Sequence, residues 1–239
     1  MNCKSIPNKE RLIFAMDVPN YSEAKSIVNE LGDSIVFYKI GLELMMSGEY
    51  FELLDWLLAQ NKKVFCDLKF FDIPATVGSA VRQLKNRGVS FLTVHGNFSM
   101  LNAAAENKGE TLKVLGVTAL TSLDRGDLND LGFECNIDDL VLSRAKQTLD
   151  AGCDGVISSG LEVPKLRKYV DNKLIIVSPG IRPVDNKPTG DQKRVVSVES
   201  AFSNGADYIV VGRPIRDAVN PREAAEAMQS SIESHINKT

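Results

Sequence analysis

The sequence predicts an α/β fold in which eight parallel strands close into one (β/α)8 barrel, also called a TIM barrel. Short apolar runs alternate with amphipathic stretches throughout the 239 residues, and that order produces a parallel sheet. Eight such runs are present, which is the number that closes a barrel of this kind. An open, doubly wound sheet is the alternative. It would need a Gly-x-Gly-x-x-Gly turn after the first strand, and residues 17–20 contain no glycine.

The strands are predicted from apolar runs that are short and bounded by polar or glycine-containing segments. In chain order they are Leu12–Asp17, Ile35–Ile40, Lys63–Asp67, Phe91–His95, Lys113–Thr118, Gly155–Ser158, Leu174–Val177 and Tyr208–Val211. Strands of a parallel sheet are covered on both faces, so mostly apolar runs are what such strands require.

The helices are predicted from the amphipathic stretches between the strands. In chain order they are Ser22–Leu31, Tyr50–Gln60, Ala75–Arg87, Ser99–Asn107, Ile137–Ala151, Val163–Val170, Val198–Asn204 and Arg222–Ile236. Pro74 and Pro221 stand where proline commonly opens a helix. Gly88, Gly152 and Gly205 each follow a helix, where a left-handed cap favours glycine.

Composition excludes several classes of protein. The net charge of -3 does not suggest a nucleic-acid-binding protein, which usually carries excess positive charge. No apolar run reaches the roughly 18 residues of a membrane span. We expect one domain over residues 1–239, with residues 1–11 as a short N-terminal extension that lacks the apolar core of a signal peptide. The four cysteines show no Cys-x-x-Cys spacing, so we expect free thiols in a reducing, cytoplasmic compartment.

Polar and charged residues gather at the predicted carboxyl ends of the strands. They are Asp17, Lys39, Asp67 with Lys69, His95, Thr118 near Thr121 and Ser122, Ser178 with Pro179 and Gly180, and Gly212 with Arg213. Barrel topology brings these strand ends around one mouth, which is where barrel enzymes carry their active sites. Two acids, two lysines and an arginine in one concave site suit a small anionic substrate.

The stretch from Val64 to Pro74 is the most informative in the chain. Asp67 and Lys69 lie two residues apart at the end of a buried strand, so alternation points both side chains the same way, and Asp72 follows. Such a cluster is costly to desolvate and is rarely a packing device. Because carboxylates favour the ammonium form, we expect Lys69 to donate a proton rather than to act as a Schiff-base nucleophile. A buried structural ion pair is the alternative.

Two connections are long and follow the carboxyl ends of strands. They are residues 119–136 and residues 182–196. Long loops in a compact domain are usually functional, so the second is expected to be a mobile lid, with a plain surface loop as the alternative. After the eighth strand, Gly212 lets backbone N–H groups approach an anion and Arg213 supplies a charged fork, as a phosphate site requires.

The histidines carry weaker signals. His95 could be a general acid, although a histidine at a strand end more often lines a pocket or bonds a backbone carbonyl, and His235 lies in the last helix without a functional sign. No metal site is expected, because lysines interleaved with the carboxylates compete with a cation.

Residues 67–76 resemble the Asp-x-Lys-x-x-Asp-Ile-Pro-x-Thr signature of the orotidine 5′-phosphate decarboxylase family. Supporting similarities follow the order of the chain and cover residues from about 12 to 217. They are the segments at residues 15–19, 38–41, 117–122, 178–182 with 190–192, and 211–215. Taken singly, only the motif after the third strand is specific; taken together, the motifs are highly specific.

This resemblance implies a lyase that converts orotidine 5′-monophosphate (OMP) to uridine 5′-monophosphate (UMP) and CO2 in de novo pyrimidine biosynthesis, without a metal or cofactor. It also implies a homodimer with shared active sites. The implied catalytic residues are Lys39, Asp67 and Lys69, with Asp72 supplied by the partner subunit. Lys69 would protonate C6 of the pyrimidine after CO2 leaves.

Further substrate contacts are implied by the same resemblance. They are Asp17 and Lys39 at the ribose, Thr121 or Ser122 at the pyrimidine edge, Ile73 and Thr76 across the interface, and Pro179, Arg182, Gln192, Gly212 and Arg213 around the phosphate. Gln192 would also reach the base.

Two other functions stay open at this point. One is a related barrel enzyme that acts on sugar phosphates with Mg2+, such as a keto-gulonate-phosphate decarboxylase or a hexulose-phosphate synthase. The other is a catalytically silent barrel that binds nucleotide phosphates. The Thr121-Ser122 pair and residues 190–192 favour the pyrimidine substrate, and binding alone does not require Asp67 beside Lys69.

Overall fold

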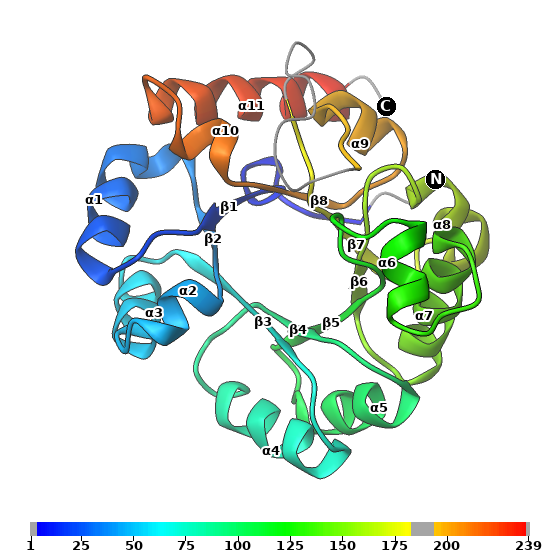
Figure 1. Ribbon diagram of the computed structural model, residues 1–239. Coiled ribbons are helices and arrows are strands. Elements are labelled where there is room, and N and C mark those ends of the chain that lie inside the picture. The colour runs from blue at the N-terminus through cyan, green and yellow to red at the C-terminus, as the bar shows by residue number, and fades with distance from the viewer. Residues whose placement is uncertain (1–3, 183–193, 238–239) are drawn as a thin grey trace.

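The computed structural model describes residues 4–182 and 194–237, in which eight parallel strands form a closed barrel surrounded by helices (Figure 1). Each strand pairs with its neighbour along the chain, and β1 pairs with β8 to close the ring. The strands are β1 (Leu12–Met16), β2 (Phe37–Ile40), β3 (Lys63–Phe70), β4 (Phe91–Val94), β5 (Lys113–Val117), β6 (Gly155–Ile157), β7 (Ile175–Ser178) and β8 (Tyr208–Val211). The predicted (β/α)8 barrel is confirmed. β3 departs most from its predicted bounds, because it continues to Phe70.

The helices expected between the strands are present on the outside of the barrel (Figure 1). They are α1 (Tyr21–Leu31), α3 (Tyr50–Ala59), α4 (Pro74–Leu84), α5 (Phe98–Asn107), α7 (Ile137–Asp150), α8 (Val163–Val170), α9 (Val198–Ser203) and α11 (Pro221–Ile236). Short elements that the sequence analysis missed are α2 (Leu42–Met46), α6 (Arg125–Asp130), α10 (Arg213–Arg216) and the 3-10 turns η1 (Asn8–Glu10) and η2 (Gly32–Ser34). Elements this short contain too few turns to show a hydrophobic period.

Local signals explain where the helices begin and end. α1 begins at Tyr21 rather than Ser22, because the side chain of Asn20 accepts a hydrogen bond from the Glu23 N–H at 2.9 Å and caps the first turn. α4 and α11 each have proline in the first turn, as predicted. The three glycines predicted to follow helices all have positive φ, at 83°, 77° and 100°.

Apolar side chains fill two layers, one inside the barrel and one between the strands and the helices. Along residues 12–16, alternate side chains belong to the two layers, as strand geometry requires. The rings of Phe37, Phe91 and Tyr208, each at the start of a strand, lie with centroids 5.0 to 6.1 Å apart inside the barrel. This aromatic floor fills the amino-terminal end and leaves room at the other end, where the strands finish.

The first described residues are held against the amino-terminal end of the barrel. The Lys4 ammonium donates to the carbonyl of Leu174 and to the Asp207 carboxylate, both at 2.6 Å, and Ile6 packs against the interior apolar layer. Within residues 4–182 and 194–237, no helix is both long and apolar enough to cross a bilayer. Three cysteines in these ranges are free thiols, and Cys3 lies outside them.

Candidate active site

A cavity of about 490 Å³ opens at the mouth of the barrel, where the strands end. Eleven of the residues singled out from the sequence line it together. They are Asp17, Lys39, Asp67, Lys69, Thr121, Ser122, Pro179, Gly180, Arg182, Gly212 and Arg213. These residues come from the carboxyl ends of six strands, β1, β2, β3, β5, β7 and β8, and the fold itself places them around one space.

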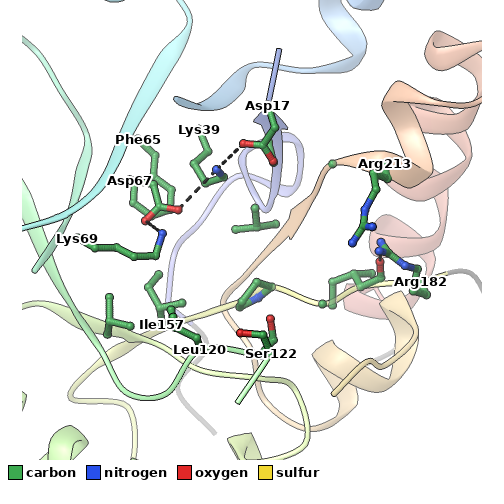
Figure 2. A pocket seen from close by; sticks show the side chains of 18 of the residues that line it. Asp17, Lys39, Phe65, Asp67, Lys69, Leu120, Ser122, Ile157, Arg182 and Arg213 are labelled. Carbon is green, nitrogen blue, oxygen red and sulfur yellow. Dashed lines mark hydrogen bonds and ion pairs between the residues drawn. The ribbon is translucent and has the colours of Figure 1, made fainter. Parts of the chain in front are cut away.

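Four side chains at the ends of three neighbouring strands form the charged wall of this cavity. The Lys39 ammonium lies 3.0 Å from an oxygen of Asp17 and 3.5 Å from Oδ2 of Asp67. The other oxygen of Asp67, Oδ1, lies 2.9 Å from the Lys69 ammonium. Figure 2 shows these groups in one continuous row along β1, β2 and β3. Charge therefore alternates in sign from Asp17 to Lys69.

Mutual attraction favours the ionised forms of Lys39 and Asp67, the two most buried members of this row. Burial alone would lower the pKa of Lys39, but the carboxylates of Asp67 and Asp17 outweigh burial and raise it. Burial alone would raise the pKa of Asp67, but Lys39 and Lys69 outweigh burial and lower it. A lysine and a carboxylate that are both charged in a cavity of low polarity create a strong local field.

The side chains of Asp67 and Lys69 meet for a different reason from the one predicted. Four steps along β3 separate Cys66 from Phe70, but their partners on β4, Leu92 and Val94, are two steps apart. β3 therefore carries two extra residues in a bulge, and Lys69 adopts the left-handed backbone conformation with φ 48°. Simple alternation was the wrong explanation, and the bulge aims the Lys69 ammonium at Asp67. Non-glycine residues with such backbone strain cluster at functional sites.

The opposite end of the cavity carries two arginines. Figure 2 shows the guanidinium groups of Arg182 and Arg213 away from Lys69, across the cavity. Gly212 lies between β8 and α10, and a Cβ atom at this position would lie 3.3 Å from the side chain of Ala15. A side chain here would be in tight contact with β1, so glycine lets the backbone pass close to that strand without crowding. An anionic group of a ligand fits this end, since both arginines are charged.

Asp72, Ile73 and Thr76 do not line the cavity of their own chain. Asp72 is exposed and accepts a hydrogen bond from the N–H of Ile73 at 2.6 Å. Phe71 and Ile73 beside it expose 67% and 65% of their surfaces, which is unusual for large apolar residues. The single chain thus assembles three of the four residues predicted as catalytic. Gln192 lies outside the described residues.

His95 stands apart from the charged row and does not line the cavity. Its ring lies edge-on to Phe71, and Nε2 is 3.5 Å from the Arg144 guanidinium. Burial, together with the charges of Arg144 and Lys69, lowers the pKa of His95 to about 4. The imidazole is therefore neutral near pH 7, and the possibility that it acts as a general acid loses its geometric basis.

Sequence reasoning missed several residues at the mouth. Thr93 on β4 donates a hydrogen bond to Asp67, and Arg216 on α10 donates one to the carbonyl of Asp17 at 2.6 Å. Arg194 donates to Glu162 at 2.7 Å and to the carbonyl of Leu120. Thr93 carried one visible signal, because it is the polar residue within the apolar run of residues 91–94. The two arginines carried none, since arginine is ordinary on a protein surface.

The fold and the charged mouth define the chain as a (β/α)8-barrel enzyme with an internal site for a small anionic molecule. A family model described as "Orotidine 5'-phosphate decarboxylase / HUMPS family" matches residues 10–228. The chain belongs to this family. It is 64% identical over 229 residues to an orotidine 5′-phosphate decarboxylase of Methylococcus capsulatus, covering 96% of this chain and 94% of the relative.

Other relatives agree with this assignment. An orotidine 5′-phosphate decarboxylase of Xanthomonas euvesicatoria is 52% identical, with coverage of 95% of this chain and 93% of the relative. Among solved structures, an orotidine 5′-phosphate decarboxylase of Lactobacillus acidophilus superposes with a TM-score of 0.82 at 35% identity, covering 93% of this chain and 99% of that one. The predicted family is therefore confirmed from both sequence and fold.

Proposed function

We propose that this chain converts OMP to UMP and CO2, a step of de novo pyrimidine biosynthesis, in the cavity at the barrel mouth. The family match and the named relatives support this activity, which makes the chain a carboxy-lyase. The single observation that carries the mechanism is the Asp67 carboxylate, which bridges the ammonium groups of Lys39 and Lys69 at 3.5 and 2.9 Å. The substrate is a pyrimidine nucleotide.

The cavity accommodates the nucleotide in one direction. The phosphate binds at the end bordered by Arg182, Gly212 and Arg213, where positive charge is concentrated. The ribose hydroxyls bind to Asp17 and Lys39 in the middle of the row. The base then lies towards Lys69, with its edge against the loop that follows β5. Contacts of this base with Thr121 or Ser122 complete the arrangement, and Pro179 also lines the cavity.

The chemical step needs a stabilised carbanion. When the bond between C6 and the carboxyl carbon breaks, its electron pair stays on C6 in the plane of the ring, where the π system does not delocalise it. The Lys69 ammonium, directed by Asp67 at 2.9 Å, stabilises this charge and then transfers a proton to C6. The product carries hydrogen where the substrate carried carboxylate, and the freed lysine regains a proton from solvent.

Asp67 acts on both sides of this step. It holds Lys69 in place, and its lowered pKa keeps the carboxylate charged beside the departing carboxyl group. Repulsion between these two anions disappears as the substrate group becomes neutral CO2, which favours the transition state over the bound substrate. Lys39 balances part of the charge of Asp67 from the side opposite Lys69.

A homodimer completes the site in this proposal. Asp72 reaches the cavity of the partner subunit, with Ile73 and Thr76 nearby. Support comes from the exposed apolar side chains around it, since Phe71 and Ile73 would leave water on association. Gln192, which lies outside the described residues, would bridge base and phosphate. We also place the enzyme in the cytoplasm, because the three described cysteines are free thiols.

The test is an ultraviolet assay that follows loss of OMP, run with and without a chelator. We expect turnover that is unchanged by chelation. An absence of OMP turnover, together with turnover of a sugar phosphate that chelation abolishes, would favour the second candidate, a Mg2+-dependent reaction on sugar phosphates. The donor set disfavours it, because both oxygens of Asp67 already face lysine ammonium groups. Binding of UMP without any turnover of OMP would instead indicate a silent nucleotide-binding barrel.

A further inference from the structure

One buried hydroxyl connects the two central residues of the charged row. Thr93 lies on β4 and has no exposed surface. Its Oγ1 accepts a hydrogen bond from the backbone N–H of Lys69 at 2.9 Å and donates one to Oδ1 of Asp67 at 2.8 Å. The same Oδ1 atom lies 2.9 Å from the Lys69 ammonium. A single oxygen of Asp67 thus receives both the threonine hydroxyl and the proton donor of the reaction.

The bulge in β3 explains why a side chain is needed at this place. Residues 67–69 stand opposite Thr93 alone, because the ladder between β3 and β4 resumes only at Phe70. A bulge leaves backbone groups without their ladder partners, and an unpaired buried N–H is costly. The threonine hydroxyl supplies the missing acceptor for the Lys69 N–H. It therefore stabilises Lys69 in its strained backbone conformation at φ 48°.

The direction of the two hydrogen bonds follows from the number of protons available. A hydroxyl group has one proton to donate and can accept from others. Since the Lys69 N–H is a donor, the hydroxyl receives at that side and directs its own proton at Asp67. An ionised carboxylate can accept the hydrogen bond from this hydroxyl, whereas a protonated carboxyl group is a poorer acceptor. The contact therefore favours the charged form of Asp67.

We propose that Thr93 is a positioning residue, which holds Asp67 and Lys69 in their reactive arrangement through one hydroxyl group. This inference rests on the proposed function, because it assigns a role in that reaction. Thr93 itself does not line the cavity, so it acts through the two residues that do. Its effect is on geometry and charge at the site, whereas ordinary packing of a threonine would affect stability alone.

The charged and titratable groups that face this pair come from several elements. They are Lys39 on β2, Asp17 after β1, Cys66 on β3, Tyr50 on α3 and His95 after β4. Cys66 and Tyr50 are neutral near pH 7, since burial raises the pKa of both. His95 is also neutral there. A change at Thr93 will therefore act on a row in which Asp17, Lys39 and Lys69 carry the charge around Asp67.

The experiment compares Thr93→Val, Thr93→Ser and Thr148→Val with the unaltered enzyme. Valine keeps the shape and removes the hydroxyl, and serine keeps the hydroxyl. Thr148 is the matched control, because it is a buried threonine whose hydroxyl donates to the carbonyl of Arg144, away from the cavity. Steady-state kinetics with OMP across pH and hydrogen exchange at the Lys69 amide are the measurements.

We expect Thr93→Val to lower kcat by about 10- to 100-fold with less than about 3-fold change in KM, as misplaced reacting groups do. The acid limb of its kcat/KM profile moves to higher pH, because Asp67 loses a donor. Exchange at the Lys69 amide becomes faster. Thr93→Ser restores all three properties, and Thr148→Val changes none of them. If Thr93→Val does not fold, Thr93→Cys replaces it, since a thiol is a weaker donor, and an intermediate kcat is expected.

Unchanged kcat, pH profile and Lys69 exchange in Thr93→Val would overturn the inference. So would an equal loss in Thr93→Ser, which would show that packing of the methyl group is what matters. The amide exchange separates this inference from the proposed function. If the unaltered protein does not consume OMP, the proposed function fails. Faster exchange of the Lys69 amide in Thr93→Val would still show, without any activity measurement, that the hydroxyl holds the bulge.

Discussion

Two buried aspartates at opposite ends of the barrel have similar surroundings and different consequences. Asp67 at the mouth and Asp207 at the amino-terminal end expose 13% and 11% of their side chains, and each faces two cationic groups. The cations around Asp207, Lys4 and Arg167, also donate to backbone carbonyls. Around Asp67, the Lys69 ammonium borders a cavity of about 490 Å³.

The difference teaches that burial and charge do not by themselves make a site. The Asp207 carboxylate accepts hydrogen bonds from the N–H of Ile176 at 2.8 Å and from the side chains of Lys4 and Arg167. Each of these groups thus has a protein partner, and the cluster holds the N-terminal segment against the start of β8. At Asp67 the Lys69 side chain borders open space, and strain is retained in its backbone. A charged cluster can act on a ligand only if some of its hydrogen-bond donors face the space that the ligand occupies.

The largest effect expected from this comparison is that of Lys69→Ala. Turnover of OMP should fall by about 10,000-fold or more, because both carbanion stabilisation and proton transfer are lost. UMP should still bind through the arginine end of the cavity. Lys63→Ala is the control, since it removes a lysine from the opposite end of the same strand. Normal turnover by Lys69→Ala, measured by ultraviolet absorbance, would remove Lys69 from the mechanism.

Asp72 allows a test of how the mouth is completed. Lys69→Ala and Asp72→Ala proteins should each be nearly inactive. Mixed after subunit exchange, they should recover about a quarter of the activity, because about half of the dimers are mixed and each of these holds one intact site. The assay needs proof of exchange by mass spectrometry of differently labelled subunits. Exchange without recovery would contradict the shared site.

At the other end of the barrel, Asp207→Asn should destabilise the fold and spare the chemistry. Removing one partner of a buried ion pair costs about 3 kcal/mol of unfolding free energy, since Lys4 and Arg167 lose their anionic partner. Asp33→Asn serves as the control, because its carboxylate is almost fully exposed 3.9 Å from Lys62. Urea titration gives the stability, and kcat per folded molecule should stay at its original value. A loss of kcat without a loss of stability would refute the comparison.

The smallest effect concerns His95 and pH. Its pKa is about 4 in the folded chain and about 6.5 when unfolded, so the unfolded state takes up the proton first as pH falls. Stability should therefore decrease between about pH 6.5 and pH 4. The stabilisation that Asp67 provides is lost only at pH values below this window, because its pKa in the folded state is lowered. Urea midpoints of His95→Gln should show a weaker slope in the window, and equal slopes would contradict the assigned cause.

Much of this arrangement could be predicted because it depends on short-range pattern. Apolar runs fixed where strands lie, and parallel topology then required Asp17, Lys39, Asp67 and Arg213 to meet at one end. The local sequence did not predict the bulge, because the residue with the left-handed backbone conformation is Lys69 rather than a glycine. The sequence therefore led to the right contact between Asp67 and Lys69 through the wrong backbone geometry.

Other features depend on partners far along the chain. Thr93 reads as an ordinary β-branched residue of a buried strand, and its role appears only when β4 is placed beside the bulge. Arg194 meets Glu162 across 32 residues, a separation that no periodicity encodes. The N-terminal segment was expected as an extension, and its contacts with Asp207 required the closed barrel. The role proposed for Asp72 involves a second chain, which the sequence of one chain does not describe.

The most direct test of the central claim is a crystal structure of the protein with UMP bound. The account predicts that the Lys69 nitrogen points at C6 of the pyrimidine at a distance of about 3 Å, with Asp67 on its other side. The phosphate should lie against Arg182 and Arg213. A base bound with C6 turned towards the loop after β5, and the Lys69 nitrogen facing away from the ring, would contradict it.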